Sequence, residues 1–467
     1  MLLASLHRRR STLAVAGTLL AVATHSGLAQ QALPSDSAVQ ALLRDRVESK
    51  RSSGIVVGII DSGGRRRVAS YGLSGAPGSA ALDGNSVFEI GSITKVFTTA
   101  ILSDMVARGE VSLDDPLAKY LPSSVRIPAR GGKQITLLDL ATQSSGLPRL
   151  PTNFHPKDQS NPYADYSVAQ MYEFLSGYAL TRDIGSLYEY SNLGMGLLGH
   201  ALALRSGMSY EALVTARVLD PLGMKDTRIT LTPSMTSRLA VGHDPAGAPV
   251  PNWDLPTLAG AGAIRSTVND MMLFLAANMD STRSPLSREM SLAHQSRRPT
   301  GNPALTIGLG WHILRSPDGG QIIWHNGQTA GYHGFLGYVP ERQVGVVMLA
   351  NSAADIDDMA LHLLDERLPL KPAPRVHTEI ALDSTLLQRF VGSYRFTPAF
   401  AIVVTRDGNR LFAQATGQPK FPIFAESPTE FFLRVVDAQL SFVVEGGAVT
   451  GVVLHQAGQT LPAKREP

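Results

Sequence analysis

The chain has 467 residues, 44% of them hydrophobic and 17% charged, which is a globular composition in a chain too long for one ordinary core. It contains no cysteine, which excludes disulfides, thiolate nucleophiles and thiolate zinc sites. Its 42 basic and 39 acidic residues form no basic stretch with interleaved aromatics, so a nucleic-acid partner is not expected.

Residues 1–29 are typical of a secretory signal peptide. Arginines at 8–10 precede an apolar core at 13–23, and the small residues Gly27 and Ala29 follow, as a signal peptidase requires. The apolar core is shorter than the roughly 20 residues that span a bilayer. We therefore expect cleavage and export to the periplasm or the medium, with no transmembrane segment left; the alternative is an uncleaved anchor. Without the leader's arginines the chain is balanced, with 39 basic and 39 acidic residues.

The first elements after the leader are predicted from apolar periodicity. Residues 37–50 have the pattern of an amphipathic helix, and residues 92–108 have that of a second helix. Between them, residues 54–61 and 66–71 are short β-rich runs separated by Ser-Gly-Gly, which predicts a hairpin.

From about residue 110 to 300, helical periods are interrupted by proline and glycine, and few strands are expected. A meander of four strands then leads into a helix, at residues 309–314, 321–325, 334–339, 344–349 and 355–368. Strands at both ends with helices between them imply a sheet assembled from distant parts of one domain, residues 30–370.

A proline-rich linker is predicted at residues 371–377, because the run from Leu368 to Pro374 cannot continue a helix. Beyond it, residues 378–467 alternate between apolar and polar, with Asp-Gly-Asn and Gly-Gly turns, which predicts a small β-barrel or sandwich. This part carries no constellation of nucleophile, base and acid. Its expected role is packing or oligomerisation.

Ser92 and Lys95, in FEIGSITK at residues 88–95, are the most informative pair in the chain. The lysine follows the serine by one helical turn, so both side chains should share a helix face. A lysine amine can take the proton of a serine hydroxyl only when burial or nearby positive charge keeps it neutral. Alone, the pattern also fits a solvated helix start with Ser92 as N-cap.

Tyr190 and Asn192, in Tyr-Ser-Asn, precede an apolar helix start. A tyrosine beside two cations can relay a proton near neutral pH, and an amide can both donate to a substrate carbonyl and accept from a lysine. The alternative is an ordinary helix cap with a packed tyrosine.

His325, Asn326 and Gly327 form the third motif, in IIWHNGQTAG at residues 322–331. A lone histidine on a strand is often structural. Glycine, however, weakens a strand unless something must approach its backbone closely, and we expect that something to be substrate. The 12 histidines show no metal-ligand spacing, so neither a metal nor another cofactor is expected.

These three motifs, in this order and with long spacings, resemble those of the serine β-lactamases and penicillin-binding proteins. Tyr-x-Asn is the middle element of the class C β-lactamase-like branch, which includes D,D-peptidases and esterases. Segments at 135–148, 220–227 and 260–274 strengthen the resemblance, which covers about residues 35–367. It implies an α/β (α+β) fold, with an antiparallel sheet flanked by helices and a mostly helical subdomain. The tail from about residue 378 resembles the lipocalin-like β domains of some relatives.

The resemblance implies an acyl-enzyme mechanism. Ser92 Oγ would attack an amide or ester carbonyl while Lys95 and Tyr190 manage its proton, and Asn192 would orient the substrate and the lysine. The backbone N–H groups of Ser92 and Gln328 would form the oxyanion hole. Whether Lys95 or Tyr190 is the acylation base stays open.

His325 stands where true class C β-lactamases have the lysine of Lys-Thr-Gly. Lysine is a permanent cation for a substrate carboxylate, whereas histidine is half protonated only near about pH 6.5. If His325 binds a carboxylate as imidazolium, acylation by anionic substrates should weaken as pH rises. The Tyr-Pro-Asn that helps hold a carboxylate in relatives is also replaced, by residues 351–355.

The leading hypothesis is an exported serine hydrolase that opens β-lactam rings or cleaves D-alanyl peptides through an acyl-Ser92 intermediate. One alternative is a carboxylesterase of the same clan, because esters need no carboxylate anchor. Another is a binding protein that penicillin acylates without turnover. The sequence leaves open the physiological substrate, deacylation, the oligomeric state and the role of the C-terminal module.

Overall fold

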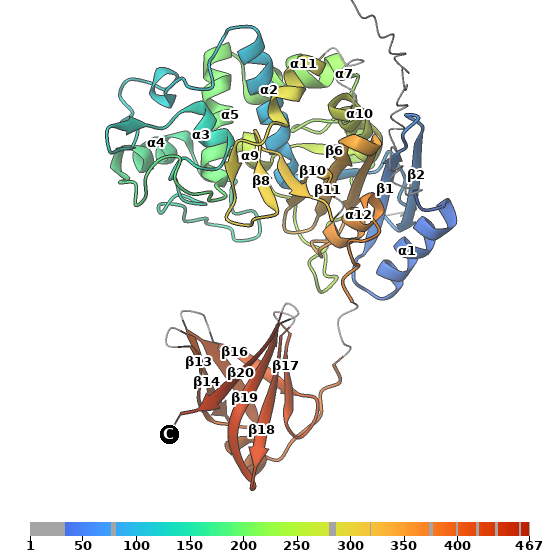
Figure 1. Cartoon of the computed structure of the whole chain (residues 1–467), viewed down its shortest axis with the longest axis vertical. Helices are drawn as coiled ribbons and strands as arrows, with labels where there is room; N and C mark the ends of the chain where they lie inside the picture. The colour runs from blue at the N-terminus through green and yellow to red at the C-terminus, as the bar shows by residue number, and fades with distance from the viewer. Residues whose placement is uncertain are drawn as a thin grey trace, which may run out of the picture. The chain divides into compact units, whose positions relative to one another are not determined.

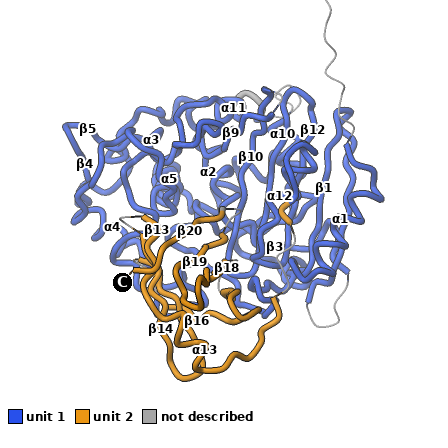
Figure 2. The backbone as a smooth tube through the Cα atoms, turned by 60° about the horizontal axis from the view of Figure 1, so that its bottom comes forward, with its two compact units in different colours: residues 1–370 blue, residues 371–467 orange. Residues whose placement is uncertain are grey.

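The computed structural model describes residues 33–75, 81–279, 286–317, 319–372, 377–397, 400–416, 420–434, 438–456 and 459–466. The predicted signal peptide and the middle of the predicted linker, residues 373–376, lie outside this part. The chain divides after residue 370 into two compact units (Figures 1 and 2). Every helix in the described ranges is too short or too polar to cross a bilayer.

An eight-stranded antiparallel sheet organises the first unit (Figure 1). Its order, β2-β1-β12-β11-β10-β9-β8-β7, places β1 from the start of the unit beside β12 from its end. The bounds are β1 (Gly54–Ile60), β2 (Arg66–Gly72), β7 (Arg298–Pro299), β8 (Leu305–Ile307), β9 (His312–Arg315), β10 (Gln321–Gln328), β11 (His333–Val339) and β12 (Val344–Ala350). The predicted hairpin, meander and joining of distant segments are therefore confirmed, while the short strands β7 and β8 were not predicted.

Helices cover both faces of this sheet. α1 (Asp36–Glu48) and α12 (Asp357–Leu364) pack on one face, and α10 (Val268–Met279) packs on the other. Successive residues of β1 alternate between the two hydrophobic cores, as the period of a strand requires: Val57 joins α1 and α12, and Val56 joins α10. Burial on both faces explains why β1 is apolar throughout.

A mostly helical subdomain adjoins the sheet, and α2 (Thr94–Ala107) lies between the two (Figure 1). Its helices are α3 (Leu137–Ala141), α4 (Val168–Gly177), α5 (Asn192–Ser206), α6 (Tyr210–Val214), α7 (Asp220–Leu222), α8 (Pro233–Thr236) and α9 (Ala259–Gly262). α11 (Ser287–Ala293) packs against α2. Two strand pairs complete the unit, β3 (Val87–Glu89) with β6 (Arg265–Thr267) and β4 (Ala129–Arg130) with β5 (Lys133–Gln134). Nearly every residue of α2 is buried, so this helix carries its polar side chains into the protein interior.

The second unit is a closed antiparallel barrel of eight strands, preceded by the short helix α13 (Ser384–Gln388). The strands are β13 (Gly392–Thr397), β14 (Phe400–Asp407), β15 (Arg410–Ala415), β16 (Lys420–Ala425), β17 (Glu430–Leu433), β18 (Ala438–Glu445), β19 (Ala448–Gln456) and β20 (Gln459–Arg465). The predicted barrel is confirmed. The sequence did not reveal β13, β16 or β20, and the last two contain Pro422 and Pro462, which weaken a strand pattern.

Candidate active site

Ser92 lies in a single 3₁₀ turn, Gly91–Ile93, that runs directly into α2. Gly91 has φ +49°, and a Cβ atom there would lie 2.8 Å from the backbone nitrogen of Gln328. Only glycine combines this conformation with so close an approach. The turn is thereby pressed against the end of β10, and Ser92 is left half-buried.

Lys95 is fully buried one turn further along, and its amine has three oxygen neighbours. Nζ lies 2.9 Å from Ser92 Oγ, 2.9 Å from Asn192 Oδ1 and 2.7 Å from the Ala261 carbonyl oxygen. Burial, with a smaller contribution from the charge of Arg149, holds the pKa of Lys95 well below its usual range. The amine is therefore placed and tuned to take a proton from the hydroxyl.

Tyr190 and Asn192 are held by the chain segment at residues 143–149. Gln143 accepts from the Glu189 N–H with its carbonyl (2.7 Å) and from the Ser191 N–H with its side chain (2.8 Å). The Arg149 carbonyl accepts from the first two N–H groups of α5, at 3.0 and 3.2 Å. Gln143 and Arg149 belong to none of the three sequence motifs, although Gln143 lies inside the 135–148 segment and Arg149 directly after it.

The Tyr190 side chain is partly buried, and its phenol faces the Ser92 hydroxyl. Burial raises the pKa of Tyr190, and neither the Ser92 bond nor the nearby charge of Arg149 offsets that effect. Lys95 Nζ lies 4.7 Å from the centroid of the Tyr190 ring, and the Arg149 guanidinium carbon lies 5.1 Å from it. The phenol is thus kept protonated between two basic side chains.

His325 lies beside this group, and it is only 1% exposed. Its ring centroid is 6.4 Å from that of Tyr190 and 5.2 Å from that of His312. Burial, followed by the charges of His312 and Lys95, lowers the pKa of His325 well below its usual value. The expectation of an imidazolium that binds a substrate carboxylate is therefore not supported, because this ring is neutral and enclosed.

Gly327 does mark a close approach to the backbone. The sequence predicted that substrate would be the neighbour, and this prediction is wrong. A Cβ atom at Gly327 would lie 2.0 Å from the Ile90 carbonyl oxygen and 3.0 Å from the Ile93 nitrogen. The neighbour is therefore the protein's own backbone on either side of Ser92. The structure thus brings Ser92, Lys95, Tyr190 and Asn192 together and sets the Gln328 backbone against the same turn.

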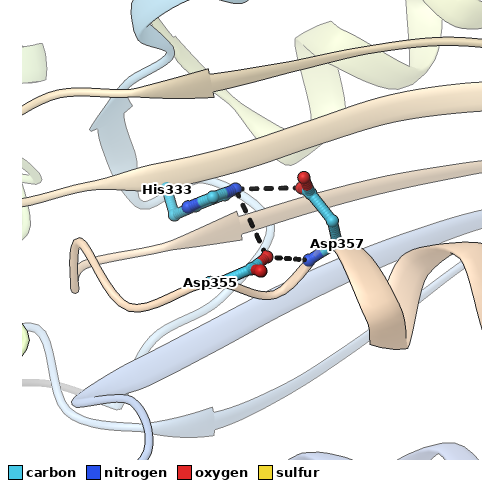
Figure 3. Close-up of side chains that lie close together, drawn as sticks. All are labelled: His333, Asp355 and Asp357. Carbon is cyan, nitrogen blue, oxygen red and sulfur yellow. Dashed lines mark hydrogen bonds and ion pairs between the residues drawn. The ribbon is translucent and has the colours of Figure 1, made fainter. Parts of the chain in front are cut away.

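Asn326 points to the other face of β10, toward a cluster of His333, Asp355 and Asp357 (Figure 3). Asp357 accepts from Asn326 Nδ2 at 2.5 Å and from His333 Nε2 at 2.9 Å, and its N–H donates to Asp355 at 2.8 Å. The three possible metal ligands lie within 4.8 Å of one another. These side chains already bond to one another and to Asn326. Their hydrogen bonds connect the end of β10 to β11 and to the start of α12.

A cavity of about 570 Å³ is lined largely by aromatic and apolar side chains. Asn192 Nδ2 donates to the Tyr163 hydroxyl at 3.2 Å, and Tyr163 lines this cavity together with Leu150, Phe154 and Trp253. A larger hollow of about 640 Å³ lies between the β1–β2 turn and α10, and Ser92 is not among its lining residues. The aromatic cavity is thus connected to the Ser92 group through the hydrogen bond between Tyr163 and Asn192.

Comparison with known proteins matches residues 39–368 to the Beta-lactamase family and residues 377–465 to a domain of unknown function, DUF3471. The D-alanyl-D-alanine-carboxypeptidase/endopeptidase AmpH of Escherichia coli is 30% identical over 349 residues, 69% of this chain and 88% of the relative. A penicillin-binding protein of Bacillus subtilis is 28% identical over 425 residues, 85% of this chain and 91% of the relative. The crystal structure of a class C β-lactamase from Rhodobacter sphaeroides superposes with a TM-score of 0.60 at 26% identity, covering 71% of this chain and 99% of that one.

Proposed function

The chain belongs to the β-lactamase family and is a serine hydrolase, and from this premise we propose that it is exported and acts on D-alanyl peptides or β-lactams through an acyl-Ser92 intermediate. The observation that carries the proposal is the buried Lys95 amine 2.9 Å from Ser92 Oγ. The substrate class is suggested by relatives named as a D-alanyl-D-alanine carboxypeptidase and a penicillin-binding protein. Export is suggested by the predicted leader at residues 1–29.

Lys95 is the base that we favour for acylation. A neutral amine has two N–H donors and one lone pair. The donors go to Asn192 Oδ1 and the Ala261 carbonyl, which leaves the lone pair facing the Ser92 hydroxyl. As Oγ forms its bond to the substrate carbonyl carbon, the hydroxyl proton passes to Lys95.

Tyr190 then relays that proton. Its raised pKa makes a phenolate costly, so it acts as a neutral hydroxyl that donates to the leaving nitrogen or oxygen while taking a proton from the Lys95 ammonium. The bond from the carbonyl carbon to the leaving group breaks as that proton arrives. Water attacks the acyl-serine in the second half of the reaction and returns the Ser92 proton.

The oxyanion hole is assigned to the backbone N–H groups of Ser92 and Gln328. Support comes from the tight packing of the Ser92 turn on the end of β10, where Gly91 abuts the Gln328 nitrogen. Backbone donors fixed in this way need no reorganisation as negative charge develops on the substrate oxygen, and removing one such donor typically costs about 3 kcal/mol.

A carboxylesterase is the second candidate function, and one observation favours it. The neutral, enclosed His325 places no positive charge at the position of the Lys-Thr-Gly lysine. An ester substrate needs no anchor for a carboxylate, so this loss would not affect its binding.

The experiment compares three substrates on purified protein that begins at residue 30: a D-Ala-D-Ala peptide, nitrocefin and a p-nitrophenyl ester. We expect turnover of the peptide or of nitrocefin, a Ser92 adduct by mass spectrometry, and neither in Ser92→Ala. Ester cleavage alone would replace our proposal with the carboxylesterase. A lasting penicillin adduct without turnover of any of the three would identify a binding protein instead.

A further inference from the structure

We propose that the guanidinium of Arg149 is the cation that binds an anionic group of the substrate, in practice a carboxylate, at the mouth of the Ser92 site. The inference rests on the proposed acyl transfer by Ser92. It assigns the preference for charged substrates to a residue that lies outside the three recognised motifs.

The two other basic groups beside Ser92 cannot serve this purpose. Lys95 has no exposed surface, and its amine is committed to three oxygen neighbours. His325 is 1% exposed, and its ring is packed against those of Tyr190 and His312. Neither presents a charge to a ligand.

Arg149, in contrast, is exposed and always charged. Its guanidinium carbon lies 5.1 Å from the centroid of the Tyr190 ring, so the charge lies beside the same ring that Lys95 Nζ approaches to 4.7 Å. Stacking of a guanidinium on an aromatic face restricts its motion and leaves its N–H edge available for a bidentate carboxylate.

The backbone of Arg149 is fixed in the same frame as the catalytic groups. Its carbonyl accepts from the N–H groups of Asn192 and Leu193, at 3.0 and 3.2 Å. A cation held by the loop that carries Tyr190 and Asn192 keeps a constant distance from the scissile bond, which positioning of a substrate requires.

Within the part of the chain that the structure describes, no side chain or carbonyl accepts a hydrogen bond from the Arg149 guanidinium. Two nearby arginines are already paired, Arg182 with Glu189 and Arg298 with Asp139 at 3.6 Å. An unpaired, aromatic-stacked arginine beside a nucleophile is a site for an anion rather than an element of the fold.

The test uses two substrate pairs that differ in charge. Benzylpenicillin and its methyl ester differ on the leaving-group side, and p-nitrophenyl hydrogen succinate and p-nitrophenyl butyrate differ on the acyl side. The ratio of acylation rate constants, anionic over neutral, is measured for the wild type, Arg149→Gln, Arg149→Lys and the control Arg66→Gln. Arg66 is an exposed arginine on β2, which three strands separate from β10.

We expect Arg149→Gln to lower the ratio about 10- to 100-fold in at least one pair, since a hydrogen-bonded charge pair is lost. The ratio for Arg149→Lys should lie between those of the wild type and Arg149→Gln, because lysine keeps the charge but lacks the planar pair of N–H donors. The ratio for Arg66→Gln should match that of the wild type. The wild-type ratio should also decrease with added NaCl, while that of Arg149→Gln should not.

An unchanged ratio in both pairs would overturn the inference. So would an equal loss with charged and neutral substrates, because Arg149 would then act only through Lys95 and Tyr190. If the wild type forms no Ser92 adduct with any of the four compounds, the proposed function itself fails, and the inference fails with it.

Discussion

Gly91 and Gly327 let the Ser92 turn pack against the end of β10, because neither position has room for a Cβ atom. At Gly91 that atom would lie 2.8 Å from the Gln328 nitrogen, and at Gly327 it would lie 2.0 Å from the Ile90 carbonyl oxygen. Both obstacles are backbone atoms, which cannot move aside as a flexible side chain can. Two glycines thus bring together the two peptide groups to which we assign the oxyanion hole.

Gly327→Ala should therefore separate the Ser92 turn from β10. We expect acylation to slow about 100-fold, the typical cost of a displacement of about 1 Å at a reacting centre, together with a lower Tm. Gly177→Ala is the matched control, because Gly177 ends α4 and a Cβ atom there meets nothing within 4 Å. The control should keep its acylation rate. If Gly327→Ala is acylated as fast as the wild type, the basis for the proposed oxyanion hole is lost.

The sequence predicted the main strands and the barrel, because apolar periodicity is a local property of the chain. It predicted the grouping of Ser92, Lys95, Tyr190 and Asn192, because the order of their motifs resembles that of a known family. It could not predict which neighbour requires Gly327, since that neighbour is backbone more than 200 residues earlier in the chain. Nor could it predict the protonation of His325, which depends on burial by distant elements.

Arg149 illustrates the same limit for function. In the sequence it is one arginine after a recognised segment, and its closeness to Tyr190 depends on hydrogen bonds such as those between its carbonyl and the start of α5. Tyr163 was missed for a similar reason, because only the fold brings its hydroxyl to Asn192.

The lowered pKa of Lys95 links stability to pH. The native state holds fewer protons than the unfolded state between that lowered pKa and the usual value of 10.5, so stability should rise with pH in this window and level off above it. Lys95→Met lacks the group, and the wild type's stability relative to it should grow by up to about 1.4 kcal/mol per pH unit. Urea unfolding from pH 6 to about 10 measures the difference. A stability difference that stays constant with pH would mean that the pKa of Lys95 is not lowered in the native state. Lys225→Met, at an exposed lysine, is the control.

His325 should not cause any preference for anionic substrates to vary with pH. Its pKa lies well below 6.5, so the ring stays neutral while pH rises through that value. We expect the ratio of kcat/KM for benzylpenicillin and its methyl ester to be flat from about pH 6 to 7.5, since histidine ordinarily titrates near 6.5. A ratio that falls with rising pH would restore the imidazolium role suggested by the sequence.

Asp357 should support catalysis from the far face of β10. Removing its carboxylate in Asp357→Ala leaves His333 and Asn326 without their acceptor, which we expect to cost about 1–3 kcal/mol of stability and to slow acylation. Asp357→Asn keeps one carbonyl acceptor and should recover part of both. EDTA should leave the rate unchanged, because the cluster's groups bond to one another. A loss of activity in EDTA that Zn²⁺ or Mn²⁺ restores would contradict this interpretation.

The ion pair of Arg46 and Asp358 joins α1 to α12, next to the Asp357 cluster. The two groups are 2.6 Å apart with side chains 6% and 3% exposed, and Arg46 also donates to the Asp355 carbonyl at 3.0 Å. Arg46→Met leaves a carboxylate buried without its cation, which typically costs about 3–5 kcal/mol. The double variant Arg46→Met with Asp358→Leu should recover much of that loss, because no buried charge is then left unpaired. Urea unfolding of the wild type, Arg46→Met, Asp358→Leu and the double variant completes a double-mutant cycle, and additive losses would show that the two side chains are not coupled.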